Sequence, residues 1–293
     1  MERRKFESCL VHLLMKQTPA RNRFKQQFGQ ANHYLVTSLV ALHHLEVSDI
    51  KGAPPELHTT WNPKDRTVSI HRTRLFTLQS ILGSAVDSID MYISLLYRKP
   101  NYIRNLELCS ELDGANRSVQ KKVYAVAAHY HIDPMILALV DVLITWRNNV
   151  VHELAENTLR PETRTSLKEN SEKISETYRG LVVDRLPQKA EEGVGLTFKE
   201  TASLINAAHH FVEHVDAAVI ERLDMESLCI DLVRDALESK DQSSNFGAKY
   251  YSLPSEKRRR FIQNWLTNVF GIGDQSNSTI EACLQIHLKP NAG

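Results

Sequence analysis

The sequence predicts an all-α protein, and three observations support this class. Glycine and proline, which most often interrupt regular elements, number only 11 and 10 in 293 residues, which argues against a loop-rich β protein. Leu, Ala, Glu, Lys and Arg, which favour helices, are plentiful. Along most of the chain, apolar residues recur at intervals of three and four, the period of one helix face. We therefore expect a helical bundle with additional N- and C-terminal helices.

The first 70 residues predict two helices followed by a linker. Residues 2–16 and 31–47 have helical periodicity, and the basic stretch 21–25 lies between them. Residues 48–70 contain three prolines and Gly52 and form the first clear break. Within this break, residues 67–70 are expected to add a short extended piece.

The middle of the chain predicts the longest helices. Residues 73–97 carry apolar side chains on one face: Leu75, Leu78, Leu82, Val86, Ile89 and Ile93. Shorter helices are expected over 102–112 and 118–131. Asp133 and Pro134 indicate a further helix start, because Asp is a favoured N-cap and Pro fits the first turn. This helix is expected to reach about Glu156.

The last third of the chain predicts a charged surface helix over 162–179 and a loop over 181–196. Thr197 is expected to cap a strong helix that ends near Leu223, and two more helices follow near 226–239 and 254–269. The predicted organisation is an N-terminal helical segment with a linker (1–70), a helical bundle (71–223) and a C-terminal appendage (224–293).

Composition and charge are those of an ordinary soluble globular protein. Lys and Arg total 36 against 35 Asp and Glu, so any nucleic-acid contact must come from local basic patches. The four cysteines are far apart and form no C-x-x-C pair, which excludes a zinc ribbon and gives no disulfide framework. We expect no signal peptide and no membrane span, and therefore a reduced, cytoplasmic protein.

An unusual polar stripe lies on the apolar helix that follows Pro134. Asp141, Thr145, Asn148 and His152 are spaced by four, three and four residues and share one face. A simply solvated face would carry Lys, Glu and Arg instead. Buried against a monomer's core, the stripe would leave unsatisfied polar groups, at about 1–3 kcal/mol each. We therefore expect it to face a polar cleft.

Arg147 and His152 are five residues apart on the same helix. Their side chains point about 140° apart on an ideal helix, so one helix does not form a tight Arg–His pair. A second copy of the helix, related by a two-fold axis, brings these groups together more easily. The spacing therefore indicates a composite site in a homodimer.

The pattern Arg147-Asn148-x-x-x-His152 resembles the R-N-x-x-x-H signature of the HEPN family of all-α ribonucleases. The resemblance covers about residues 71–223: a long helix with acidic residues, the motif helix, a variable loop and a closing helix. It implies a homodimer through the motif helix. It further implies an RNA substrate and a role in antiphage defence or as a toxin effector, with an antitoxin or sensor protein as a possible partner. Where some family toxins have a regulatory Tyr, two residues after the histidine, this chain has Leu154.

The residue types of the motif suit RNA cleavage. An imidazole with a pKa near ~6.5 can remove the proton of the 2′-hydroxyl or return one to the leaving 5′-oxygen. The guanidinium of Arg147 can hold a phosphate oxygen and stabilise the extra negative charge of the transition state. Asn148 can orient substrate or hold His152. This mechanism needs no metal or cofactor, and its requirement for a 2′-hydroxyl excludes DNA.

Two acidic residues on the preceding helix are expected to support the site. Asp87 and Asp90 are three residues apart and share a helix face. We predict that at least one of them approaches the Arg147 guanidinium and fixes its rotamer. The alternative is a solvated carboxylate far from Arg147.

Other patterns leave alternative functions open. The chain could be a catalytically inactive RNA-binding or scaffold protein of the same family. His210-x-x-Glu213-His214 matches the inverted zinc-peptidase signature and suggests a zinc hydrolase, although Glu281 is about the only third-ligand candidate. A basic cluster near the C-terminus could hold RNA phosphates, or could be a solvated helix start: Lys257, Arg258, Arg259 and Arg260.

Overall fold

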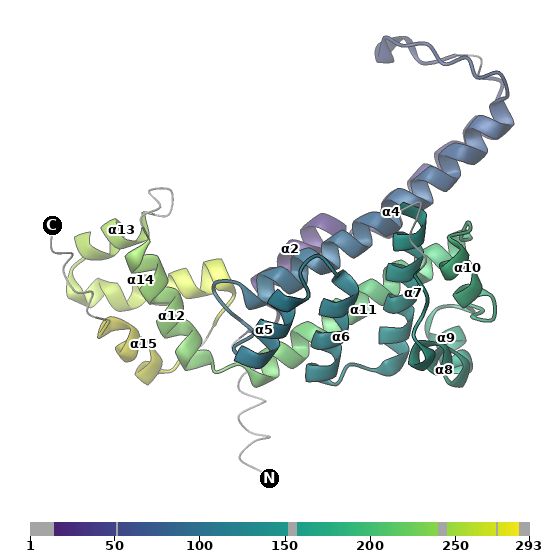
Figure 1. Cartoon of the computed structure of the whole chain (residues 1–293). Coiled ribbons are helices and arrows are strands. Elements are labelled where there is room, and N and C mark those ends of the chain that lie inside the picture. Colours follow the sequence, from purple (N-terminus) through teal and green to yellow (C-terminus); the bar gives the residue numbers. More distant parts are fainter. Residues whose placement is uncertain (1–14, 51, 152–156, 240–244, 274, 287–293) are drawn as a thin grey trace. The chain divides into compact units, whose positions relative to one another are not determined.

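A computed structural model of the chain describes residues 15–50, 52–151, 157–239, 245–273 and 275–286. Within these ranges every regular element is a helix, so the predicted all-α class is confirmed (Figure 1). The chain forms two compact units. Unit 1 combines residues 1–23, 92–114 and 213–293, and unit 2 combines residues 24–91 and 115–212. The predicted division into 1–70, 71–223 and 224–293 stays a prediction.

Unit 2 contains the residues of the motif helix. Its helices are the end of α2 (Pro19–Phe28), α3 (Ala31–Val47), most of α4 (Arg66–Tyr97), α6 (Val119–Tyr130), α7 (Pro134–Val151), α8 (Pro161–Glu169), α9 (Ser171–Thr177), α10 (Leu186–Glu192) and most of α11 (Phe198–Arg222). A short 3₁₀ turn, η1 (Pro55–Leu57), lies between α3 and α4. The motif helix is α7, and it packs against α6, α8 and α10.

The helix α7 is the core helix of unit 2. It begins as predicted, with the Asp133 carboxylate accepting a hydrogen bond from the Met135 amide at 2.8 Å. Its side chains are buried along most of its length, up to Trp146, and become partly exposed from Arg147 onward. By length and composition α7 could cross a membrane, but 61% of it is buried inside the structure, as in the core helix of a soluble protein. The open end of α7 is therefore the end that carries the motif.

The helix α11 begins with a reciprocal capping box, which confirms Thr197 as its N-cap. The Thr197 amide donates to Glu200 Oε2 at 2.7 Å, and the Glu200 amide donates to Thr197 Oγ1 at 3.2 Å. Lys189 adds an ion pair to the same carboxylate at 2.8 Å. The ion pair between Lys189 of α10 and Glu200 thus attaches the first turn of α11 to α10.

Several predicted boundaries are wrong. Residues 67–70 are helical, because Asp65 caps the start of α4 by accepting the Val68 amide at 3.0 Å. The basic stretch 21–25 lies inside α2, and α10 lies inside the predicted loop 181–196. The predicted helix over 162–179 is two helices, α8 and α9, which meet at Asn170. The predicted helix over residues 2–16 lies almost entirely outside the described residues.

Unit 1 contains the ends of α4 and α11 together with α5 (Leu106–Gly114), α12 (Met225–Glu238), α13 (Phe246–Ser252), α14 (Ser255–Phe270) and α15 (Asn277–Leu284). The helices α13 and α15 were not predicted. Aromatic side chains hold α13 against α14, with the Phe246 and Trp265 ring centroids 4.4 Å apart.

A buried carboxylate anchors the start of α2 within unit 1. Asp216 on α11 is fully buried and accepts hydrogen bonds from the Thr18 amide (3.0 Å), the Thr18 hydroxyl (2.5 Å) and the Tyr92 hydroxyl (3.2 Å). Burial raises the pKa of Asp216 above its usual value, while the hydrogen bonds from Thr18 oppose this rise.

Candidate functional site

Arg147 is held by two side chains at the open end of α7. Its Nη2 donates to Asp87 Oδ1 on α4 at 3.0 Å, and its Nη1 donates to Asn148 Oδ1 at 3.1 Å. The prediction that Asp87 or Asp90 approaches Arg147 is therefore confirmed, and Asp87 is the residue that does so. Asp90 instead pairs with Lys122 of α6 at 2.7 Å. The two carboxylates thus attach α4 to two different helices.

The arrangement leaves Arg147 able to bind an anion. An arginine has five N–H donors, and Asp87 and Asn148 each take one of them. Nε is buried without a partner among the described residues and is out of reach of a ligand, but each terminal nitrogen keeps a second N–H. The Asp87 side chain is 64% exposed and that of Arg147 is 22% exposed. A pair this open is worth about 0–1 kcal/mol, and the second N–H of each terminal nitrogen can bind a phosphate while Asp87 keeps its contact.

The other half of the motif, His152, lies outside the described residues, and so does Leu154. The described part of the site ends at Val151, whose side chain is 56% exposed. The structure therefore places Arg147, Asn148 and Asp87 together.

The expectation that Asp141 and Thr145 line an open cleft is wrong. Both side chains are fully buried inside unit 2. Asp141 Oδ1 accepts from Gln120 at 2.6 Å, and Oδ2 accepts from the hydroxyls of Tyr124 at 2.7 Å and Thr163 at 2.6 Å. Partners from α6 and α8 therefore satisfy this acid within one chain. Thr145 Oγ1, by contrast, has no partner among the described residues.

The side chains around Asp141 form a closed network. Burial raises the pKa of Tyr124 far above its usual value, so its hydroxyl stays protonated and can donate to Asp141. The guanidinium of Arg160 lies over the Tyr124 ring, 3.5 Å from its centroid. This network fastens the middle of α7 to its neighbours, so Asp141 supports the fold rather than contacting a substrate.

Asn149 is a residue of the site region that the sequence analysis missed. Its Nδ2 donates to the carbonyls of Asn157 (2.8 Å), Ala190 (3.0 Å) and Glu191 (3.1 Å), and its Oδ1 accepts the Asn157 amide at 2.9 Å. The Asn149 side chain, which follows Arg147 and Asn148, therefore joins α7 to α10 and to the backbone at Asn157. The doubled asparagine after Arg147 was the only signal in the sequence.

Gly193 allows α10 to end against the motif helix. It caps α10 with φ of +62°, a conformation that favours glycine. A Cβ atom here would contact the Asn149 backbone at 3.4 Å and Val150 at 3.5 Å. The positive φ therefore favours glycine here, whereas the approach to Asn149 and Val150 is at ordinary van der Waals distance.

The zinc alternative gains no support from the described residues. Among them, no group of three or more His, Cys, Asp or Glu side chains is placed to hold a metal ion. His210 Nδ1 lies 3.1 Å from the hydroxyl of Tyr178, and His214 is exposed to solvent. The two histidines share a helix but lack a third ligand in this part of the chain.

The basic cluster of α14 is partly used in packing. Its four members are Lys257, Arg258, Arg259 and Arg260. Arg258 donates to the carbonyl of Leu253 at 3.1 Å, and Arg259 pairs with Glu281 of α15. The two outer members are exposed. A role for this cluster in RNA binding stays a prediction.

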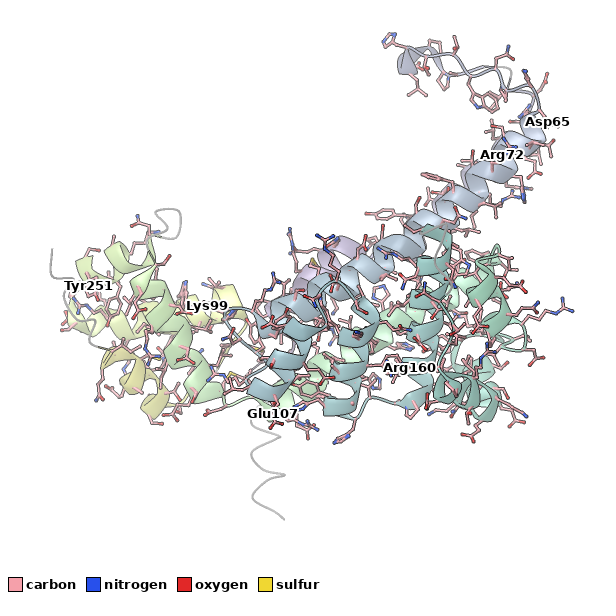
Figure 2. All side chains as sticks on the ribbon, viewed as in Figure 1. Asp65, Arg72, Lys99, Glu107, Arg160 and Tyr251 are labelled. Atoms are coloured by element: carbon pink, nitrogen blue, oxygen red, sulfur yellow. The ribbon has the colours of Figure 1, made fainter. Side chains whose placement is uncertain are left out.

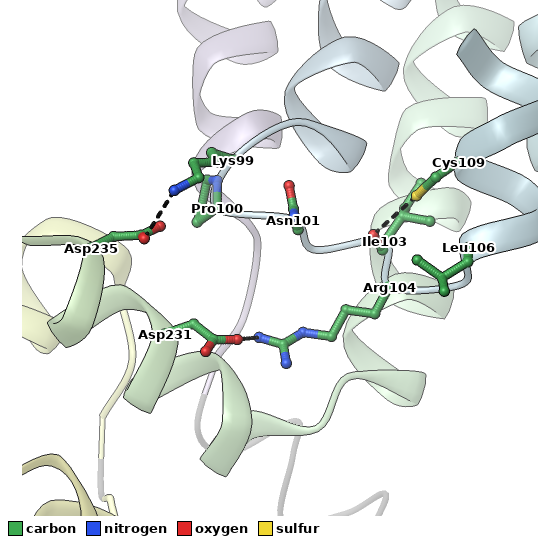
Figure 3. A pocket seen from close by; sticks show the side chains of 9 residues that line it. All are labelled: Lys99, Pro100, Asn101, Ile103, Arg104, Leu106, Cys109, Asp231 and Asp235. Atoms are coloured by element: carbon green, nitrogen blue, oxygen red, sulfur yellow. Dashed lines mark hydrogen bonds and ion pairs between the residues drawn. The ribbon is translucent and has the colours of Figure 1, made fainter. Parts of the chain in front are cut away.

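A cavity of about 380 Å³ lies in unit 1, between the chain after α4 and helix α12 (Figure 3). Two ion pairs cross it: Lys99 with Asp235 at 3.1 Å, and Arg104 with Asp231 at 2.8 Å (Figure 3). Burial raises the pKa of the nearby Cys109 thiol, so the thiol is a poor nucleophile. Each cation already has a carboxylate, and the cavity therefore offers little positive charge to a phosphate.

Comparison with known proteins assigns no family to the chain. No family model matches it, and neither a curated protein nor a solved structure shows significant similarity. The HEPN resemblance therefore depends on the motif in the sequence.

Proposed function

We propose that the chain is a metal-independent endoribonuclease of the HEPN type, with Arg147 and His152 as catalytic residues and Asn148 beside them. One observation carries this proposal: Arg147 is held by Asp87 and Asn148 at the open end of a buried helix, five residues before His152. Because α7 is otherwise buried, its position is well defined, and the arginine is presented at its exposed end.

The reaction follows from these side chains. His152 takes the proton of a ribose 2′-hydroxyl, and the 2′-oxygen attacks the adjacent phosphorus. The bond from phosphorus to the 5′-oxygen breaks, and that oxygen receives a proton from a protonated imidazole. Arg147 binds the non-bridging oxygens and stabilises the charge that develops on them. The products are a 2′,3′-cyclic phosphate and a 5′-hydroxyl.

The proposal includes a homodimer that joins two motif helices. Because Arg147 and His152 point about 140° apart on one ideal helix, a second copy supplies the missing partner more easily. We further propose a cytoplasmic effector of antiphage defence or a toxin, controlled by an antitoxin or sensor protein.

The test is cleavage of RNA by the purified full-length protein in EDTA. We expect cleavage to persist with the chelator and to leave 2′,3′-cyclic phosphate ends, and a 2′-deoxy substitution at the cleaved position to abolish it. Cleavage that disappears in EDTA and returns with zinc would instead favour the site at His210 and His214. RNA binding with no cleavage at all would identify the inactive RNA-binding alternative.

Two substitutions test the site directly. Arg147→Ala and His152→Ala should each abolish cleavage, while the protein remains folded and dimeric. Arg117→Ala, which changes another exposed arginine of unit 2, should leave the rate unchanged. Mixing the two inactive variants should restore little activity if the cleft needs both arginines and both histidines. An active wild-type monomer, or a wild-type rate in either variant, would contradict the proposal.

A further inference from the structure

The N-terminal part of α4 exposes one long face within unit 2. The face runs from Asp87 through Gly83 and Ser80 to Phe76 and Arg72, at spacings of three and four residues. The Phe76 side chain is 69% exposed, and Arg72 is also exposed (Figure 2). Because Asp87 contacts Arg147, this face leads from the candidate site to an exposed aromatic ring and an exposed cation.

The charge of this helix segment suits an anionic ligand. From Arg66 to Val86, α4 contains three arginines and no Asp or Glu. Arg66 donates to the carbonyls of Leu45 and Ser48, and Arg74 pairs with Glu46 at 3.0 Å. Arg72 makes no hydrogen bond or ion pair with the described residues. It is therefore the arginine of this segment that remains available to a ligand.

Among the described residues, no neighbouring element covers this face of α4 at Gly83, between the candidate site and Phe76. At 1.5 Å per residue, Phe76 lies about 16 Å from Asp87 along the helix, and Arg72 about 22 Å. Gly83 and Ser80, which lie between them on this face, are small and neutral, and apart from the helix's own backbone no described atom lies within 4 Å of the position that a Cβ on Gly83 would occupy. A few nucleotides of an extended single strand of RNA can therefore lie along α4 between Asp87 and Phe76.

We propose that this face of α4 binds single-stranded RNA next to the cleavage site, with Phe76 stacking on a base and Arg72 contacting a phosphate. The proposal rests on the proposed nuclease function and specifies how its substrate is held. An aromatic ring and an arginine on adjacent helical turns are what single-stranded nucleic acid requires, since every base has a face for stacking. Between Arg66 and Val86 the helix has no carboxylate to repel the phosphates of the strand, and the exposed carboxylate of Asp87 lies at the end of the face next to the candidate site.

The experiment measures binding of a fluorescein-labelled 12-nucleotide single-stranded RNA to the full-length protein by anisotropy, over a range of salt concentrations. Phe76→Ala should weaken binding about tenfold, the size expected for one lost base stack, and leave the salt dependence unchanged. Phe76→Tyr keeps the ring and should bind within about twofold of wild type. Arg72→Ala should lower the salt slope by about 0.7, the value for one phosphate contact on a single strand. Tyr34→Ala, which removes a 58%-exposed ring on α3, is the matched control and should bind like wild type.

Several outcomes separate this proposal from the nuclease proposal. RNA binding that depends on Phe76 and Arg72 in a protein that does not cleave supports the RNA surface and overturns the nuclease. If Phe76→Ala and Arg72→Ala both cleave RNA with the wild-type KM, the nuclease proposal is unaffected and the proposal for the α4 face is overturned. The absence of any RNA binding by wild type overturns it as well. Loss of self-association in Phe76→Ala, with RNA binding unchanged, would show that the face docks a protein and would also overturn it.

Discussion

The middle of α7 and its C-terminal end place polar side chains in opposite surroundings. Asp141 lies in the middle of the helix, fully buried, with three side-chain donors from α6 and α8 around it. Arg147 lies less than two turns later, at the open end, beside a carboxylate that is 64% exposed. Both interrupt an apolar helix, yet one is fully satisfied inside the fold and the other keeps donors for a ligand. The comparison shows that burial and partners, rather than residue type, separate support of the fold from contact with a substrate.

The largest effect should follow from removing the buried acid. Asp141→Ala leaves Gln120 without its acceptor, and also one of the two hydroxyls of Tyr124 and Thr163, because these lie 2.8 Å apart and can still bond to each other. Unsatisfied buried groups cost about 1–3 kcal/mol each. We expect the free energy of unfolding to fall by about 3 kcal/mol, measured by urea denaturation. Asp184→Ala, at an exposed position of the same unit, should change it by less than about 0.5 kcal/mol. Equal stability of the two variants would contradict the structural role of Asp141.

Removing the Thr145 hydroxyl should change the free energy of unfolding by less than removing Asp141, and should raise it rather than lower it. Its hydroxyl oxygen is buried without a partner among the described residues, so its desolvation is uncompensated. Thr145→Val keeps the shape and removes the hydroxyl, and it should raise the free energy of unfolding by about 1 kcal/mol. A lower midpoint in the same urea experiment would mean that the hydroxyl has a partner in solution, and would reopen a role for Thr145 in the site.

The smallest effect on the free energy of unfolding is expected for Asp87, which contacts Arg147 at the open end of α7. Asp87→Ala removes an exposed ion pair, and the free energy of unfolding should change by less than about 0.5 kcal/mol. Under the proposed function the same variant should lower kcat for RNA cleavage several-fold, because the Arg147 guanidinium loses the contact that orients it. A large loss of stability with unchanged kcat would reverse the distinction between the middle of α7 and its open end.

The contact between Asp87 and Arg147 was predictable, but the surroundings of Asp141 were not. Helical spacing shows which residues share a face, yet Asp87 and Asp90, three residues apart, contact different helices, Asp87 the motif helix and Asp90 α6. It does not show what that face meets. The partners of Asp141 lie about twenty residues away on either side, at Gln120, Tyr124 and Thr163, and only tertiary packing brings them to one carboxylate.

Local sequence patterns predicted where helices begin more reliably than where loops interrupt them. The caps at Asp133 and Thr197 were predicted correctly because each depends on a few neighbouring residues. Pro187 and Gly193 predicted a loop, but they are the first-turn proline and the C-terminal glycine of the short helix α10. Residues 67–70, rich in β-branched side chains and serine, predicted an extended piece, and the Asp65 cap with the helical continuation of α4 overrides that preference.

The raised pKa of the buried Asp216 carboxylate couples folding of the chain to the binding of protons. Its pKa is raised in the folded chain by burial, although the Thr18 hydrogen bonds oppose the rise. Between the ordinary and the raised pKa the folded chain therefore binds more protons than the unfolded chain at this site. The contribution of Asp216 to stability is then greatest below its ordinary pKa and falls as the pH increases toward the raised value. In weakly buffered solution within that interval, heat-induced unfolding should release protons from Asp216, and this proton release should be absent in Asp216→Asn.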